Sequence, residues 1–276
     1  MENYSILMSV YYKEQKEHLA TCIRSMLQQT LPTNDFVIVC DGPLTSELDA
    51  VLNEFEEQYP DLFQIVRLPE NMGIGAAANI GLRYCKNEYI AKMDADDISV
   101  PWRCEKEMEL FAQHQELSVV GGYIAEFDDD PQSPFAIRKV PLQHEDILVF
   151  ARRRQPFNNM TVMYKKSAVE AVGGYRPLNR CEDFDLYIRL LHAGYRAQNI
   201  EAVLVHARVN AGGFSRRASM ATLKGVFSSR WYSVKIGFSS IWDYLYCVLG
   251  ELFIMISPKF VSRFVYNKIL RQQCCK

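Results

Sequence analysis

Apolar and polar positions alternate in blocks along the first 125 residues, and two spacings recur. Segments such as His18–Gln29 and Leu48–Phe55 carry apolar side chains three or four positions apart, which predicts amphipathic helices. Nearly continuous apolar runs separate them, and such runs are typical of strands buried on both faces. The alternation predicts an α/β fold with a mostly parallel, doubly wound sheet covered by helices on both faces. The runs are Ser5–Tyr12, Phe36–Cys40, Phe63–Leu68, Tyr89–Met93 and Val119–Ala125.

The pattern changes after Ala125. Three aspartates at Asp128–Asp130 are followed by prolines, which indicates a polar loop, and the segments beyond it look mixed rather than alternating. Ser219–Ile236 has the character of a helix. Ile241–Ile256 is strongly apolar, but two acids interrupt it, and it is too short and too charged to predict a transmembrane span.

The stretch Lys259–Arg271 alternates basic and apolar residues on a helical period, and several of the apolar ones are aromatic. This composition is typical of a helix that lies on a membrane surface. The alternative is that this stretch and Ile241–Ile256 both pack onto the preceding domain. We expect a membrane surface to be a partner of these C-terminal helices.

Composition and charge narrow the classes of function. The 276 residues are 49% hydrophobic with a net charge of −2, so a sizeable core is expected and a general attraction for nucleic acid is not. None of the eight cysteines belongs to a C-x-x-C pair, which favours a reducing compartment without structural zinc. Met1–Tyr4 has an acid and no basic residue, so we expect no signal peptide and a cytoplasmic location.

Three carboxylates, Asp94, Asp96 and Asp97, directly follow the apolar run Tyr89–Met93. Like charges this close repel one another, and the carboxyl ends of strands are where α/β sheets bind ligands. We therefore predict a divalent metal that holds a phosphate. Two alternatives are a phosphotransferase of the haloacid-dehalogenase type with Asp94 as nucleophile, and a capped helix start in which Asp97 or Ser99 serves as the cap.

Polar residues also follow the first three predicted strands. Asp41 precedes a Gly-Pro turn, where it either forms an Asx-turn or accepts a hydrogen bond from N3 of uracil. Ser9–Tyr12 end the first strand, and Tyr11 or Tyr12 is able to stack on a base. Two glycines open the small-residue helix after Asn71, but a third glycine is missing, so we predict close packing rather than a dinucleotide loop. Asn71 itself is able to reach a ligand.

Two later segments carry charged side chains of possible catalytic use. Glu182 and Asp183 begin a helix, where the helix dipole favours acids, and one of them could also take a proton from an alcohol. Val205–Arg208 and Gly212–Arg217 together look like a glycine-hinged basic segment that either is a solvated loop or neutralises a leaving phosphate.

The order of these motifs along residues 4–217 resembles the family 2 glycosyltransferases. The resemblance implies a GT-A fold with a nucleotide-binding half at 1–125, an acceptor-binding half at 126–217, and a C-terminal helical appendage at 218–276. The motifs are S-V-Y-Y at Ser9–Tyr12, V-C-D-G at Val39–Gly42, N-x-G at Asn71 and Asn79, M-D-A-D-D at Met93–Asp97, G-G-Y-R at Gly173–Arg176, and E-D-x-D-L at Glu182–Leu186.

The resemblance also implies roles for single residues. Asp41 would contact uracil, Asp94 would face the ribose, and Asp96 would bind a Mn²⁺ or Mg²⁺ that bridges the diphosphate. The catalytic base falls on the pair Glu182 and Asp183, with Asp183 preferred. The segment Arg208–Arg216, which includes Ser215, would close over the diphosphate. The sequence departs from the family pattern at Cys40, where an aspartate is common, at Ala76–Ala78, where a basic residue is often found, and at Asn159–Met160, where many relatives have His-Pro.

The resemblance is strongest to bacterial enzymes that build the repeat units of O-antigen and capsule. It implies an inverting transfer of galactose or N-acetylhexosamine from a UDP-sugar to a polyprenyl-diphosphate-linked saccharide. The protein would then be peripheral on the inner face of the bacterial inner membrane. A haloacid-dehalogenase-type phosphotransferase and a non-catalytic nucleotide-sugar-binding protein are the alternatives.

Overall fold

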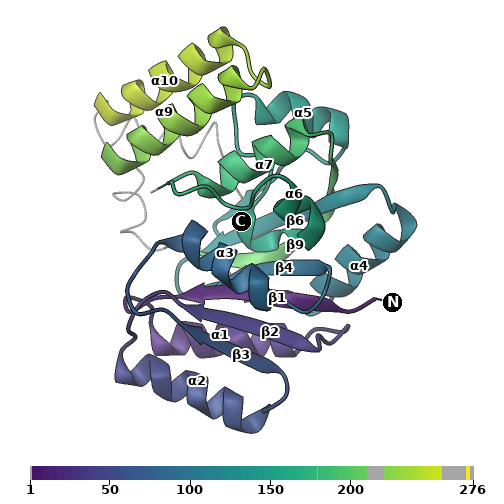
Figure 1. The fold of residues 1–276 in the computed structure, drawn as a ribbon, viewed down its shortest axis with the longest axis vertical. Coiled ribbons are helices and arrows are strands. Elements are labelled where there is room, and N and C mark those ends of the chain that lie inside the picture. The colour runs from purple at the N-terminus through teal and green to yellow at the C-terminus, as the bar shows by residue number, and fades with distance from the viewer. Residues whose placement is uncertain (1, 179, 210–219, 257–271, 274–276) are drawn as a thin grey trace.

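The N-terminal part of the chain forms a parallel sheet in the order β3-β2-β1-β4, as a computed structural model that describes residues 2–178, 180–209, 220–256 and 272–273 shows. Helices cover both faces of this sheet (Figure 1), because its strands are apolar on both sides. The predicted alternation of strands and helices is confirmed. The elements are β1 (Tyr4–Val10), α1 (Lys16–Leu27), β2 (Asp35–Cys40), α2 (Ser46–Gln58), β3 (Phe63–Arg67), α3 (Ile74–Tyr84) and β4 (Tyr89–Asp94).

The sheet continues beyond β4 with strands of mixed direction. The short strand β8 pairs antiparallel with both β4 and β6, and the long strand β6 pairs parallel with β9. This part confirms the loss of alternation that the sequence predicts after Ala125. Its elements are β5 (Ile98–Ser99), α4 (Arg103–Gln113), β6 (Leu117–Phe127), β7 (Ala136–Arg138), α5 (His144–Ala151), the 3₁₀ turn Asn159–Thr161, β8 (Met163–Lys165), α6 (Lys166–Ala171), α7 (Glu182–His192) and β9 (Arg196–Arg208).

Strand β9 corrects one expectation. The sequence predicts Val205–Arg208 within a glycine-hinged basic segment, but these residues are the last part of a 13-residue strand. The first half of that strand is rich in polar residues, so the alternation of apolar and polar positions typical of a strand is not visible in the sequence. The strand forms because β6 pairs with it along nearly its whole length.

Two helices, α9 (Met220–Lys235) and α10 (Ile241–Ile256), form a separate layer beside α7 and α5 (Figure 1). The bounds of α10 match the apolar segment that the sequence singles out. Strand β10 (Gln272–Gln273) pairs antiparallel with β7. Within the described ranges, every helix is too short or too polar to cross a membrane. The predicted basic helix at Lys259–Arg271 lies outside the described residues.

Candidate active site

The carboxyl ends of β1, β2 and β4 bring three of the predicted site residues to one edge of the sheet. Ser9 on β1 is directly opposite Asp94 on β4, and the backbone N–H of Asp41 donates to the carbonyl of Val10 at 2.8 Å. The Ser9 hydroxyl is buried there without a hydrogen-bond partner. The edge of the sheet is therefore built as the pattern of polar residues after apolar strands predicts.

The three aspartates after β4 crowd one another. Burial and the neighbouring Asp96 charge raise the pKa of Asp94 to about 6. Burial and the charge of Glu14 raise the pKa of Asp96, and burial together with the other two aspartates raises that of Asp97. Asp94 and Asp96 are partly accessible, so these two carboxylates are available to a ligand.

Asp97 has a structural task that the sequence interpretation missed. Its side chain is 2% exposed and accepts a hydrogen bond from the backbone N–H of Arg208 at 2.8 Å. The prediction that it caps the next helix is wrong, because α4 begins after Trp102 and has no side-chain cap. Asp97 instead holds the end of β9 against the loop that follows β4.

Arg208 consequently lies beside the aspartates that follow β4. Its Nε donates to the carbonyl of Asp96 at 3.3 Å, and its guanidinium carbon lies 4.6 Å from the centre of the Phe127 ring. This geometry places a permanent positive charge beside Asp96. Ser215 and Arg216, the other residues predicted to cover a diphosphate, lie outside the described residues.

Asp41 ties the end of β2 to the beginning of α3. Its two carboxylate oxygens accept hydrogen bonds from the backbone N–H groups of Met72 and Gly73, at 2.7 and 3.1 Å. Asn71 donates its side-chain N–H to the carbonyl of Asp41 at 3.1 Å. Each carboxylate oxygen keeps a second lone pair, so these bonds leave room for a further donor. The predicted contacts of Asp41 and Asn71 with a nucleotide stay predictions.

Glu182 and Asp183 occupy the first turn of α7, as predicted. One oxygen of Asp183 accepts from the backbone N–H of Phe184 and the other from Nε2 of Gln155, both at 2.7 Å. Burial raises the pKa of Asp183, although these two hydrogen bonds oppose the rise. Burial and the Asp183 charge raise the pKa of Glu182 to about 7, and its Oε2 is buried without a partner.

The acids at the end of β4 and those at the start of α7 influence one another's pKa values. Apart from burial and Asp96, the charge of Asp183 also raises the pKa of Asp94, and the charge of Asp94 raises that of Glu182. Lys92 lies on β4 and is buried, which lowers its pKa, while Asp94 and Glu182 favour its charged form. The charges of Lys92 and Asp94 thus interact with those of Glu182 and Asp183, which are about ninety positions away in the sequence.

The turn after β1 and the first turn of α1 complete the surroundings of Asp96. The charges of Glu14 and His18 both act on the Asp96 carboxylate, and Nδ1 of His18 lies 3.5 Å from Oε1 of Glu14. Tyr11 lies in the same turn, where its ring meets that of Tyr12 edge-on with 5.9 Å between centres. The base-stacking role predicted for Tyr11 stays a prediction.

Comparison with models of protein families shows the family to which the chain belongs. The family model described as glycosyl transferase family 2 matches residues 5–179. The chain is a family 2 glycosyltransferase. An uncharacterized glycosyltransferase of Haemophilus influenzae is 36% identical over 98% of this chain and 99% of its own length. This membership removes the support for a haloacid-dehalogenase-type phosphotransferase with Asp94 as nucleophile.

Two further relatives of this glycosyltransferase have named activities or pathways. The amylovoran biosynthesis glycosyltransferase AmsE of Erwinia amylovora is 32% identical over 96% of this chain and 98% of its own. An Escherichia coli enzyme named UDP-Gal:alpha-D-GlcNAc-diphosphoundecaprenol beta-1,3-galactosyltransferase is 28% identical over 98% of this chain and 97% of its own.

Solved structures confirm that the glycosyltransferase has the GT-A fold. A mannosyltransferase from Pyrobaculum calidifontis in complex with GDP-Man and Mn²⁺ has a TM-score of 0.67, with 16% identity over 91% of this chain and 69% of its own. Staphylococcus aureus TarS 1-349 in complex with UDP-GlcNAc has a TM-score of 0.65, with 15% identity over 97% of this chain and 76% of its own.

The corner after β4 fits a divalent metal that a nucleoside diphosphate helps to hold. Asp94 and Asp96 offer carboxylate oxygens, the ligands that Mg²⁺ and Mn²⁺ prefer, and a cation would relieve their mutual repulsion. In the part of the chain that the structure describes, no three His, Cys, Asp or Glu side chains are arranged to hold a metal. A site with one or two carboxylates that shares its ion with substrate phosphates has this composition.

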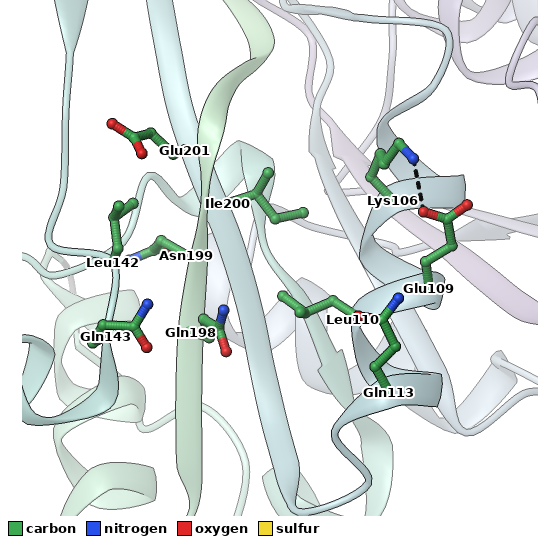
Figure 2. A pocket seen from close by; sticks show the side chains of 10 residues that line it. All are labelled: Lys106, Glu109, Leu110, Gln113, Leu142, Gln143, Gln198, Asn199, Ile200 and Glu201. Atoms are coloured by element: carbon green, nitrogen blue, oxygen red, sulfur yellow. Dashed lines mark hydrogen bonds and ion pairs between the residues drawn. The ribbon is translucent and has the colours of Figure 1, made fainter.

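A groove elsewhere on the glycosyltransferase is separate from these acids. It has a volume of about 370 Å³ and lies between α4 and the first half of β9 (Figure 2). Lys106 and Glu109 form an ion pair of 2.7 Å at this groove, and Leu110 and Ile200 add apolar lining. Because it contains none of the predicted site residues, we assign it no part in the candidate active site.

Four residues of the site were not predicted, and their signals differ. Lys92 could have been found, because it is the one charged residue within the apolar run of β4 and shares the strand face of Asp94. Glu14 sits in the turn before α1, whose path the sequence does not define, and His18 lies in the first turn of α1, where the sequence predicts a helix but does not show that it begins beside Asp96. Gln155 lies in a loop with no periodic pattern, so nothing in the sequence links it to Asp183.

Proposed function

We propose that this glycosyltransferase transfers a hexose from a UDP-sugar to a polyprenyl-diphosphate-linked saccharide with inversion at the anomeric carbon. The relatives from Escherichia coli and Erwinia amylovora support a role in the synthesis of O-antigen or capsule polysaccharide. Galactose is the preferred donor sugar, and N-acetylhexosamine is the next candidate. Such an acceptor places the reaction at the inner face of the inner membrane, where we propose that the protein acts as a peripheral protein.

The donor nucleotide is assigned to the ends of β1, β2 and β4. Asp41 accepts from the uracil, with Asn71 beside it, and Asp94 faces the ribose. Ser9 and Tyr11 form the wall next to Asp94. The buried, unpartnered hydroxyl of Ser9 supports this assignment, because a buried hydroxyl normally has a hydrogen-bond partner, and a ligand would supply one.

Asp96 is assigned to the Mn²⁺ or Mg²⁺ that the diphosphate shares. When bound, such an ion supplies positive charge at the oxygen atoms of the leaving diphosphate. Arg208 adds a second positive charge beside Asp96, and its own position is fixed by Asp97. Together these residues hold the donor and favour the departure of UDP.

Asp183 is assigned as the general base. It takes the proton of the acceptor hydroxyl while the hydroxyl oxygen attacks the anomeric carbon, and the bond from that carbon to the UDP oxygen breaks. The observation that carries the proposal is that the start of α3 contacts both Glu182 at the start of α7 and Asp41 at the end of β2, and the charges of Asp183 and Asp94 act on one another's surroundings. A single displacement needs its base next to the donor site, and this arrangement supports that requirement.

The test is an assay of the full chain with a panel of UDP-sugars, Mn²⁺ and a polyprenyl-diphosphate-linked sugar. We expect release of UDP with one donor, dependence on the metal, and a β-linked product from an α-linked donor. An α-linked product would contradict inversion. Donor binding without turnover for every acceptor would favour the non-catalytic alternative.

A further inference from the structure

Helix α10 directs its polar side chains toward the protein. Asp243 is 5% exposed and pairs with the guanidinium of Arg153, and one turn later the thiol of Cys247 donates to the carbonyl of Arg153. A further turn on, burial raises the pKa of Glu251, while nearby Arg230 opposes the rise. The inner side of this helix is therefore held by ion pairs and hydrogen bonds rather than by apolar packing alone.

The opposite side of α10 is apolar and exposed. Four large side chains spaced three or four positions apart make up this side, which we name the outer face. This is the reverse of an ordinary surface helix, whose apolar stripe faces the core. Large exposed apolar patches mark contacts with a partner or a membrane. The residues of the outer face are Trp242 at 73% exposed, Tyr246 at 63%, Leu249 at 64% and Phe253 at 57%.

The helical layer that carries the outer face is fixed to the acceptor side of the site. The guanidinium carbon of Arg230 on α9 lies 3.8 Å from the centre of the Phe184 ring, next to Asp183 on α7. Gly225 on α9 has no room for a side chain, because a Cβ there would lie 2.7 Å from the carbonyl oxygen of Arg180. Whatever the outer face contacts is thus oriented relative to the start of α7.

The charges of the C-terminal part of the sequence favour an anionic partner. From Ala202 to the C-terminus the sequence has eleven Lys or Arg residues and two acids, Asp243 and Glu251. Both acids face the protein, whereas Lys224 and Lys235 on α9 are exposed. Trp and Tyr in the outer face are the residues that prefer the boundary between lipid and water. Exposed apolar side chains beside basic ones are typical of a helix that lies on a lipid surface. A protein interface would also be expected to have polar groups that form hydrogen bonds across it, and the four residues of the outer face offer few.

We propose that the outer face of α10 inserts into the headgroup boundary of an anionic lipid bilayer and so turns the start of α7 toward lipid-linked acceptors. The inserted residues thereby account for the membrane association included in the proposed function, and only the orienting role rests on that function. Binding to vesicles needs neither donor nor acceptor, so it is tested independently of catalysis.

The first experiment is flotation of the full chain with phosphatidylcholine vesicles, with and without phosphatidylglycerol. The wild type should float with the phosphatidylglycerol vesicles. The combined variant Trp242→Ser, Leu249→Ser, Phe253→Ser should bind at least roughly tenfold more weakly, since burial of even one large apolar side chain shifts an equilibrium by about that factor. Tyr84→Ser removes an aromatic side chain that is 48% exposed at the end of α3 and is the matched control, with wild-type binding expected.

Fluorescence keeps the proposal falsifiable if the combined variant folds poorly. Trp242 is the most exposed large apolar side chain among the residues that the structure describes, so the wild-type emission should shift to the blue on addition of vesicles. Trp242→Phe should bind vesicles but lose most of the shift. Equal binding by the wild type and the combined variant would overturn the proposal. So would a wild type that ignores vesicles and forms a dimer that the combined variant cannot form.

The orienting role has its own readout. The combined variant should turn over a water-soluble diphosphate-sugar acceptor at the wild-type rate and lose activity only toward the same acceptor sugar anchored in vesicles. Loss of both activities in a folded variant would contradict the orienting role. If the wild type is inactive with both acceptors but still binds vesicles through the outer face, the proposed function fails and the docking surface stands.

Discussion

Asp183 is the carboxylate on which proton transfer depends in the proposed reaction, and the amide of Gln155 is one of the groups that set its pKa. Burial raises the pKa of Asp183 above that of an ordinary aspartate, so the active, ionised base is lost at a higher pH than usual as the solution is acidified. The N–H of Gln155 donates to the ionised form and lowers this pKa. Replacement of Gln155 must therefore move the acid limb of the activity profile upward.

We predict that Gln155→Ala shifts the acid limb of kcat/KM upward by about one pH unit, the change expected when a hydrogen bond to a charged group is lost. At higher pH its activity should approach that of the wild type. Gln58→Ala is the matched control, because Gln58 makes the same kind of bond to Glu54 on the exposed side of α2. A profile of Gln155→Ala that superimposes on the wild type would contradict the role of Gln155.

At the residue scale, the sequence predicts side chains that follow a strand or begin a helix. Asp94 and Asp183 are found this way, because strand ends and helix starts have local signals. The same reliance on local signals gives a wrong prediction for Asp97, because its partner is the backbone N–H of Arg208, which is 111 residues away. Gln155 is missed because its relation to Asp183 exists only after the loop before the 3₁₀ turn has folded against α7.

At the scale of elements, the small residues of α3 explain how closely this helix approaches the sheet. A Cβ at Gly81 would overlap the side chain of Leu7 on β1 and lie 2.7 Å from Cγ2 of Val39 on β2. Gly75 brings the same helix against Glu182, where a Cβ would lie 3.3 Å from the Cβ of Glu182. The glycines predict close packing correctly, but the sequence does not reveal that the start of α3 contacts both Asp41 and the start of α7.

We predict that Gly81→Ala lowers the free energy of unfolding by about 1–3 kcal/mol, because an added methyl group overpacks the core. Gly250→Ala on α10 is the control, since a Cβ there meets no atom within 4 Å. That substitution should raise stability by about 0.5–1 kcal/mol through helix propensity. Urea unfolding of both variants measures the difference, and equal stabilities would show that α3 is able to move away from the sheet at no cost.

At the scale of the whole molecule, the fold joins two tasks across one edge of the sheet. The parallel strands β1, β2 and β4 present the residues assigned to the donor, whereas α7 presents those assigned to proton transfer. The alternating pattern predicts the parallel part well, since each unit is local. The mixed part was not predictable in detail, because β8, β6 and β9 pair across long sequence separations and their periods are weak.

The most direct test of this division is donor binding and turnover measured together in Asp183→Asn and Asp96→Asn. In the presence of Mn²⁺, Asp183→Asn should bind the UDP-sugar with wild-type affinity while its rate of UDP release falls by roughly 10²–10⁴, the usual loss when a general base is removed. Asp96→Asn should instead lose metal-dependent binding of the donor. Asp183→Asn turning over at the wild-type rate, with the donor bound, would contradict the account.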